Sequence, residues 1–154
     1  MKSLYFGTLI IFILLIFTAC QQKSDNQAST NLMEGEGIEV VDPWARPGAE
    51  GRMSAAYFLI SNFKSEDDVL ISVETDAAQN AEVHESYERE EGMMSMREVP
   101  QLDLPAQSTV RFEQGGLHVM LMQLNRQLSD GDTFELTLTF ENNEPVTVEV
   151  PVRL

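Results

Sequence analysis

The sequence predicts an all-β fold, an antiparallel β-sandwich, and three observations predict it. From about residue 38 onward, short apolar segments follow one another, with turn-forming residues about every ten positions. Several segments alternate apolar and polar residues, most regularly residues 134–140 and 146–150, which is typical of strands with one buried face. No segment of this region repeats apolar residues at the 3.6-residue period of a helix. Many short strands of this kind favour two packed sheets.

Turn signals divide this region into nine expected strands. Asp130-Gly131-Asp132 precedes the eighth strand, and Asn142-Asn143-Glu144 joins the last two strands as a hairpin. A domain of about 115 residues can bury a core without disulfides. We expect Greek-key connections of the cupredoxin-like or immunoglobulin-like kind. The expected strands, in chain order, are residues 38–44, 54–62, 68–75, 81–88, 94–99, 108–114, 117–124, 133–141 and 145–152.

The first twenty residues have the order of an export signal. Lys2 precedes the unbroken apolar run LIIFILLIF at residues 9–17, and Thr18-Ala19-Cys20 follow it. The run is shorter than the roughly 20 residues that a membrane-spanning helix needs. A charged start, an apolar stretch and small residues at the end predict a secretory signal. Because a cysteine follows the small residues, the segment resembles a bacterial lipoprotein signal, which is cleaved before the cysteine and leaves lipid on its sulfur.

These features predict three regions. Residues 1–19 are the expected signal peptide, residues 20–37 a polar, flexible tether, and residues 38–154 the folded domain. An uncleaved N-terminal anchor is the alternative to cleavage before Cys20, and either would place the domain outside the cytoplasm, attached to a membrane. The expected location is the periplasmic side of a membrane, or the outer cell surface where the cell has a single membrane.

Composition excludes several classes of function. The chain has 10 Lys and Arg residues against 25 Asp and Glu residues, a net charge of −15, so we expect no nucleic-acid partner. Cys20 is the only cysteine, and its lipidation would remove thiol catalysis, thiolate metal sites and blue-copper electron transfer. No Ser/His/Asp arrangement and no phosphate-binding glycine loop stands out, so we expect no enzymatic activity.

Histidine and methionine gather in one part of the chain. After removal of the signal, two histidines and seven methionines remain, and five of these methionines lie between residues 93 and 122. In the strand at residues 117–122, side chains two positions apart share a face. His118, Met120 and Met122 therefore point one way and the leucines and valine the other. Met94 and Met96 share a face in the same manner, and His84 points outward while Val83 faces the core.

Each of these residues alone has an ordinary explanation. A methionine on a strand is most often a core filler, and a single histidine is most often a surface residue. The combination of imidazoles and thioethers is harder to obtain from packing. Thioethers select soft metal ions, above all Cu(I), whereas zinc prefers cysteine, histidine or carboxylate.

The spacing of these residues resembles the PCu(A)C family of periplasmic copper(I) chaperones. In that family a histidine is followed by a methionine, then by 21 residues, then by His-x-Met. Here 21 residues separate Met96 from His118-Val119-Met120, and 11 residues, one more than is typical, separate His84 from Met96. We expect the extra residue in the loop at residues 88–92. Ser86 stands where many members carry a further methionine.

The resemblance covers residues 38–152 and implies a function. It implies one Cu(I) held by His84, Met96, His118 and Met120, with Met94 and Met122 as auxiliary ligands. It implies delivery of copper to the copper subunit of cytochrome c oxidase or to a thiol-bearing assembly protein. The alternative from a different class is a structural or adhesion lipoprotein with an immunoglobulin-like sandwich and no metal, because a fold does not dictate a function.

Overall fold

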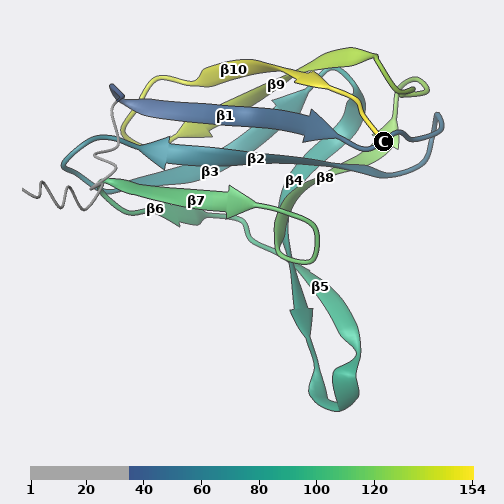
Figure 1. Ribbon diagram of the computed structural model, residues 1–154, viewed down its shortest axis with the longest axis horizontal. Helices are drawn as coiled ribbons and strands as arrows, with labels where there is room; N and C mark the ends of the chain where they lie inside the picture. Colours follow the sequence, from purple (N-terminus) through teal and green to yellow (C-terminus); the bar gives the residue numbers. More distant parts are fainter. Residues whose placement is uncertain (1–34) are drawn as a thin grey trace, which may run out of the picture. The chain divides into compact units, whose positions relative to one another are not determined.

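The computed structural model describes residues 35–154, which form a sandwich of two β-sheets (Figure 1). The prediction of an all-β antiparallel sandwich is confirmed. The expected signal peptide, Cys20 and most of the expected tether lie outside the described residues. Within residues 35–154 there is no helix with the length and apolar character that crossing a membrane requires.

The larger sheet has six strands in the order β1-β2-β7-β8-β4-β5. Neighbouring strands run antiparallel, except for a single parallel pair at Phe112 and Leu117 beside the turn that joins β7 to β8. The strands of this sheet are β1 (Ile38–Ala45), β2 (Ser54–Asn62), β4 (Ala78–Glu88), β5 (Met94–Glu98), β7 (Ser108–Phe112) and β8 (Leu117–Leu124).

The smaller sheet has four strands in the order β10-β9-β3-β6, all antiparallel. Its strands are β3 (Asp68–Thr75), β6 (Leu102–Leu104), β9 (Thr133–Phe140) and β10 (Val146–Pro151). The two sheets meet at one edge, where Ala45 of β1 forms a bridge with Val152 just after β10.

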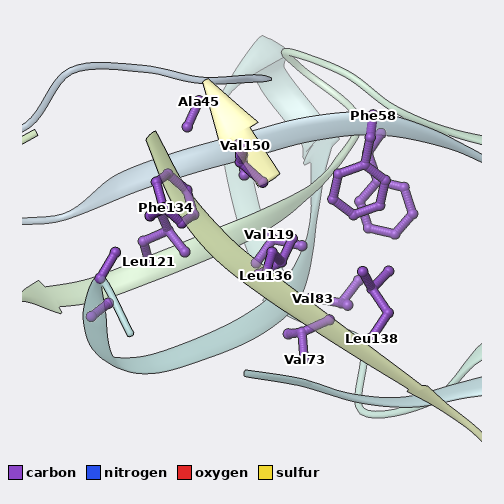
Figure 2. Packing of buried hydrophobic residues seen from close by; sticks show 14 of the residues in the cluster. Ala45, Phe58, Val73, Val83, Val119, Leu121, Phe134, Leu136, Leu138 and Val150 are labelled. Atoms are coloured by element: carbon purple, nitrogen blue, oxygen red, sulfur yellow. The ribbon is translucent and has the colours of Figure 1, made fainter. Parts of the chain in front are cut away.

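The core lies between the inner faces of the two sheets. Val83 of β4 and Val119 of β8 face Leu136 and Leu138 of β9 within one cluster of buried residues, which Figure 2 shows from close by. Phe58 and Phe112 stack in the same cluster with ring centroids 4.4 Å apart. Burying this apolar surface supplies the main stabilisation of the fold, on the order of 2 kcal/mol for each large side chain. The outer face of the larger sheet does not contribute to this core.

The expected strands agree with the observed ones to within a few residues, with one omission. The structure adds β6, whose three residues lie between two prolines and are too few to show an alternating pattern. β4 begins at Ala78 rather than at residue 81 because its first residues pair with the end of β8.

Two irregularities shape the larger sheet. β2 pairs with β8 through its first residues and with β7 through its last residues. Tyr57 lies where the partner changes, beside the turn at residues 113–116 that joins β7 to β8. In β1 a bulge lies between Val41 and Trp44, where Asp42 has a positive φ of 51°. A bulge adds one residue and turns the following side chains to the opposite face. Trp44 therefore lies opposite Tyr57 on the outer face instead of continuing the inner row.

A buried carboxylate ties the smaller sheet together. Asp68, at the start of β3, is 2% exposed, and its carboxylate accepts hydrogen bonds from the backbone N–H of Val69 (2.7 Å) and of Asn142 (2.9 Å). The side-chain amides of Asn142 and Asn143 donate to the same carboxylate. Burial by itself would raise the pKa of Asp68, but the hydrogen bonds from Asn143, Val69 and Asn142 outweigh it and lower the pKa.

We predict that the Asp68→Asn variant is less stable by roughly 2–3 kcal/mol, because an uncharged amide cannot accept this set of hydrogen bonds. A group with a lowered pKa stabilises the folded state fully above its unfolded pKa of about 3.8 and loses that contribution as the pH falls. Urea unfolding at neutral pH and near pH 3 should show a large acid loss for the wild type and a smaller one for the variant. Equal losses in both proteins would contradict this role of Asp68.

Candidate metal centre

The candidate ligands lie on the outer face of the larger sheet, where β4 runs between β8 and β5. His84 of β4 is the direct cross-strand partner of His118 of β8, and Ser86 of β4 is the partner of Met96 of β5. Met120 lies two residues after His118 and therefore on the same face. The antiparallel register thus brings together three chain segments that are far apart in sequence.

A hollow of about 200 Å³ opens on this face beside the turn at residues 113–116. Met96, His118 and Met120 line it, each from the position that the period-two pattern predicts. His84 is not among the lining residues, but it lies across the strand pair from His118, and the two ring centroids are 6.1 Å apart. The remaining residues of the lining are Arg46, Ala55, Tyr57, Ser86, Gln114 and Gly115.

The two expected auxiliary methionines lie further away. Met94 is paired with Glu88 near the tip of the β4–β5 hairpin, and Met122 is paired with Asn80 at the other end of the β4–β8 ladder. Neither residue lines the hollow. Both share a strand face with a candidate ligand, but each is one step further along its strand.

His118 is held in a fixed orientation by the backbone. It is 5% exposed, and its Nδ1 lies 3.0 Å from the carbonyl oxygen of Gly116. The same carbonyl accepts the backbone N–H of Ser86 at 3.0 Å, so one turn residue connects β8 and β4. A carbonyl can only accept, so His118 donates from Nδ1 and keeps the lone pair on Nε2. Its ring is more enclosed than an outer-face position implies, because the turn and Tyr57 cover it.

His84 has a different pair of neighbours. Its Nε2 lies 3.1 Å from Oε2 of Glu82, two residues earlier on the same strand face. Its Nδ1 is buried and has no hydrogen-bond partner among residues 35–154. The side chain is 18% exposed, so the ring is accessible only in part.

Aromatic rings form a wall of the centre. Tyr57 lies between Trp44 and His118, with ring centroids 4.7 Å and 6.5 Å away, respectively. Burial raises the pKa of the Tyr57 hydroxyl, and the positive charge of Arg46 partly opposes this shift. Both Tyr57 and Arg46 therefore lie close enough to the hollow to act on what binds there.

The opposite wall is a protruding arm. The β4–β5 hairpin extends beyond the rest of the larger sheet (Figure 1), and its tip is a short 3-10 helix at Glu90–Gly92. Met96 on this arm is 54% exposed, whereas Met120 on β8 is only half-buried among strands. The pairing of β4 with β5 is continuous from His84 to Glu88, so the hairpin tip accommodates the longer spacing between His84 and Met96.

The donor set is one of imidazoles and thioethers. Among residues 35–154, no group of three or more His, Cys, Asp or Glu side chains is placed to hold a metal ion. Hard ions such as Ca²⁺ and Mg²⁺ need several oxygen ligands. The arrangement therefore fits a soft ion better than a hard one.

Comparison with known families identifies the domain. Residues 38–152 match the model of the family described as "Putative lipoprotein LpqE-like". The chain belongs to the LpqE-like family. The matched residues run from the first residue of β1 to the residue after β10, so the family domain coincides with the sandwich.

Two relatives resemble this LpqE-like chain along most of their length. "Putative lipoprotein Lxx21020" of Leifsonia xyli subsp. xyli is 30% identical over 148 residues, which cover 96% of this chain and 88% of that protein. "Uncharacterized protein RP573" of Rickettsia prowazekii is 30% identical over 137 residues, which cover 84% of this chain and 74% of that protein.

Solved structures with the same fold include PCuAC domains. The copper-bound PCuAC domain from PmoF2 is 26% identical, with a TM-score of 0.63, and covers 78% of this chain and 95% of that domain. CuI-DR1885 from Deinococcus radiodurans is 28% identical, with a TM-score of 0.60, over 80% of this chain and 85% of that one. The apo PCuAC domain from PmoF1, 24% identical with a TM-score of 0.64 over 77% of this chain and 95% of that domain, shares the fold. The family resemblance predicted from the sequence is confirmed.

Sequence reasoning missed three residues of this LpqE-like centre. Glu82 could have been found, because it lies two positions before His84 and must share its face. Tyr57 and Arg46 could not, because they reach the hollow only through the pairing of β2 with β8 and the bulge in β1.

Proposed function

We propose that this LpqE-like protein is an exported copper chaperone that binds one Cu(I) through His84, His118, Met96 and Met120. One observation carries the proposal: Met96, His118 and Met120, from two separate strands, line one hollow, and His84 lies directly across the β4–β8 pair from His118. Similarity to a copper-bound PCuAC domain and to CuI-DR1885 supports copper as the cargo.

The geometry of the two histidines suits a shared ion. Two imidazoles that bind one ion at about 2.0 Å per nitrogen place their ring centroids about 5–6 Å apart. The observed separation of 6.1 Å lies close to this range. Thioethers then complete a soft donor set that needs no thiolate, which suits an oxidising exported compartment.

The arrangement also suits release of the ion. The histidines are held by the β4–β8 ladder, whereas Met96 lies on the exposed arm. An incoming thiolate can displace an accessible thioether first and take over the ion by stepwise ligand exchange. We therefore infer that the acceptor is a protein with cysteine ligands for copper, such as the copper subunit of cytochrome c oxidase or a thiol-bearing assembly protein. The role is binding and transfer, without catalysis.

The protein is proposed to act while attached to a membrane. The family description and the name of the Leifsonia relative both speak of a lipoprotein. Cleavage before Cys20 and lipidation of its sulfur would leave residues 21–37 as a tether. Such a tether lets the domain search for its acceptor close to the membrane surface.

Metal analysis under reducing conditions tests the function. We expect one Cu(I) per chain. His118→Ala and Met120→Ala should each weaken Cu(I) binding by at least about 100-fold, because the loss of a ligand costs more affinity than the loss of a residue that only supports a ligand. Met122→Ala is the matched control, because this methionine shares the strand and the face but does not line the hollow. Competition with a Cu(I) chelator measures all of these affinities.

Two outcomes would contradict the proposed site. Wild-type protein that binds no Cu(I) would favour the structural or adhesion role instead. A double variant, His84→Ala with His118→Ala, that keeps wild-type affinity would remove the histidines from the site.

A second prediction concerns the charge of Arg46. This guanidinium lines the hollow and forms no salt bridge in the part of the chain that the structure describes. A unit charge about 10 Å from a bound cation opposes binding by on the order of 0.5–1 kcal/mol. Arg46→Gln should therefore raise Cu(I) affinity about 2- to 5-fold at low salt, and added salt should reduce the difference. Arg52→Gln, outside the hollow, should leave the affinity unchanged; a loss of affinity in Arg46→Gln would contradict the prediction.

A third prediction concerns Cys20. The Cys20→Ser variant should leave the membrane fraction once its signal is removed, because one residue would carry the lipid. Its thermal unfolding should match that of the wild type, since the sandwich begins at Ile38. Fractionation followed by immunodetection measures the release. Membrane-bound Cys20→Ser protein without its signal would show that something other than this cysteine anchors the chain.

A further inference from the structure

We propose that Glu82 is a positioning residue that fixes His84 as the tautomer protonated on Nε2, so that Nδ1 is the atom of His84 that binds Cu(I). This inference rests on the proposed copper-binding function. It adds the identity of the ligating atoms and a supporting residue outside the four ligands.

Nδ1 of His84 is buried without a partner among the described residues. Among the described residues, Nδ1 of His84 is the one buried side-chain nitrogen or oxygen without a hydrogen-bond partner. A buried polar atom without a partner costs free energy, and native structures nearly always pair such atoms with protein, water or an ion. Nδ1 of His84 therefore needs a partner that residues 35–154 do not provide.

Nε2 of His84 carries the proton of the ring. The carboxylate of Glu82 can only accept, and its Oε2 lies 3.1 Å from Nε2 of His84. A neutral imidazole carries one proton, and this contact places the proton on Nε2. Nδ1 then carries a lone pair, so its missing partner is either a hydrogen-bond donor or a metal ion. A soft cation held at Nδ1 supplies that partner.

His118 uses its two ring nitrogens in the opposite way from His84. That residue donates from Nδ1 to the carbonyl of Gly116 and keeps its lone pair on Nε2. The two histidines face each other across the ladder, with ring planes inclined by 50°. We therefore expect one ion to bind Nδ1 of His84 and Nε2 of His118. In each case the second nitrogen is held by an oxygen atom of the protein, which is the usual support for metal-binding histidine.

The chain offers a matched control for the effect of charge. Glu98 of β5 is the direct cross-strand partner of His84, so its carboxylate also lies near the site. Nε2 of His84 donates its hydrogen bond to Glu82 and not to Glu98. Glu82→Gln and Glu98→Gln remove the same charge from neighbouring positions, but only Glu82→Gln replaces the group that selects the tautomer.

The test is NMR of the full-length protein, labelled with ¹⁵N and solubilised in detergent. In the metal-free wild type, long-range proton–nitrogen spectra should show His84 protonated on Nε2 and His118 protonated on Nδ1. With Ag(I) as a diamagnetic probe for Cu(I), coupling to silver should appear on Nδ1 of His84 and Nε2 of His118. Glu82→Gln should show a mixture of His84 tautomers and bind Cu(I) about 10- to 100-fold more weakly, whereas Glu98→Gln should keep the single tautomer and change affinity far less.

The outcomes separate this inference from the proposed function. Silver coupling on Nε2 of His84 in the wild type would overturn the inference and leave copper binding in place. Equal losses of affinity in Glu82→Gln and Glu98→Gln, with the tautomer unchanged, would also overturn it, because charge alone would then explain the effect. A wild-type protein that binds neither Ag(I) nor Cu(I) would contradict the proposed function itself.

Discussion

The register of β4 against β8 is the constraint on which the rest of the centre depends. It places His84 opposite His118 and at the same time places Val83 opposite Val119 in the core. Because strand side chains alternate, a slip of one residue would turn His84 into the core and expose Val83. Burial of the valines on one face thus fixes the histidines on the other. The hydrophobic core thus positions the two candidate ligands, although they lie on the opposite face of the sheet.

The centre combines a fixed part with an accessible part. The turn at residues 113–116 anchors His118 through the Gly116 carbonyl and also binds β4 through the N–H of Ser86. Met96, in contrast, lies on an arm that is held to the sheet through β4 alone. In the proposed site, histidines held by the β4–β8 ladder would set the geometry of the bound ion, while an exposed thioether would be the first ligand that a competing ligand displaces. A chaperone needs both properties, since it must hold its cargo and also release it.

The sequence predicted those features that arise within a single strand. Alternation in residues 133–140 revealed β9, and the two-residue spacing of His118 and Met120 placed both on one face. Features that depend on pairing between strands could not be predicted from the sequence alone. Tyr57 reaches His118 only because β2 changes partner from β7 to β8. The hydrogen bond from Nε2 of His84 to Glu82 lies within one strand, and alternation alone implies that these two residues share a face. β6 was not predicted because its three residues are too few to show an alternation of apolar and polar side chains.

Nearby charges add to the balance between holding and releasing the ion in the proposed site. A donor set of imidazoles and thioethers would leave the positive charge of Cu(I) uncompensated, and Arg46 places a second positive charge beside the hollow. Glu82 and Glu98 lie next to His84 and oppose both charges. Because Coulomb energies fall with distance and with exposure to water, these few neighbours matter more than the net charge of −15 spread over the chain. Under the proposed function, a thiolate from an acceptor would bring the negative charge that this donor set lacks, and it would therefore draw the ion away from the site.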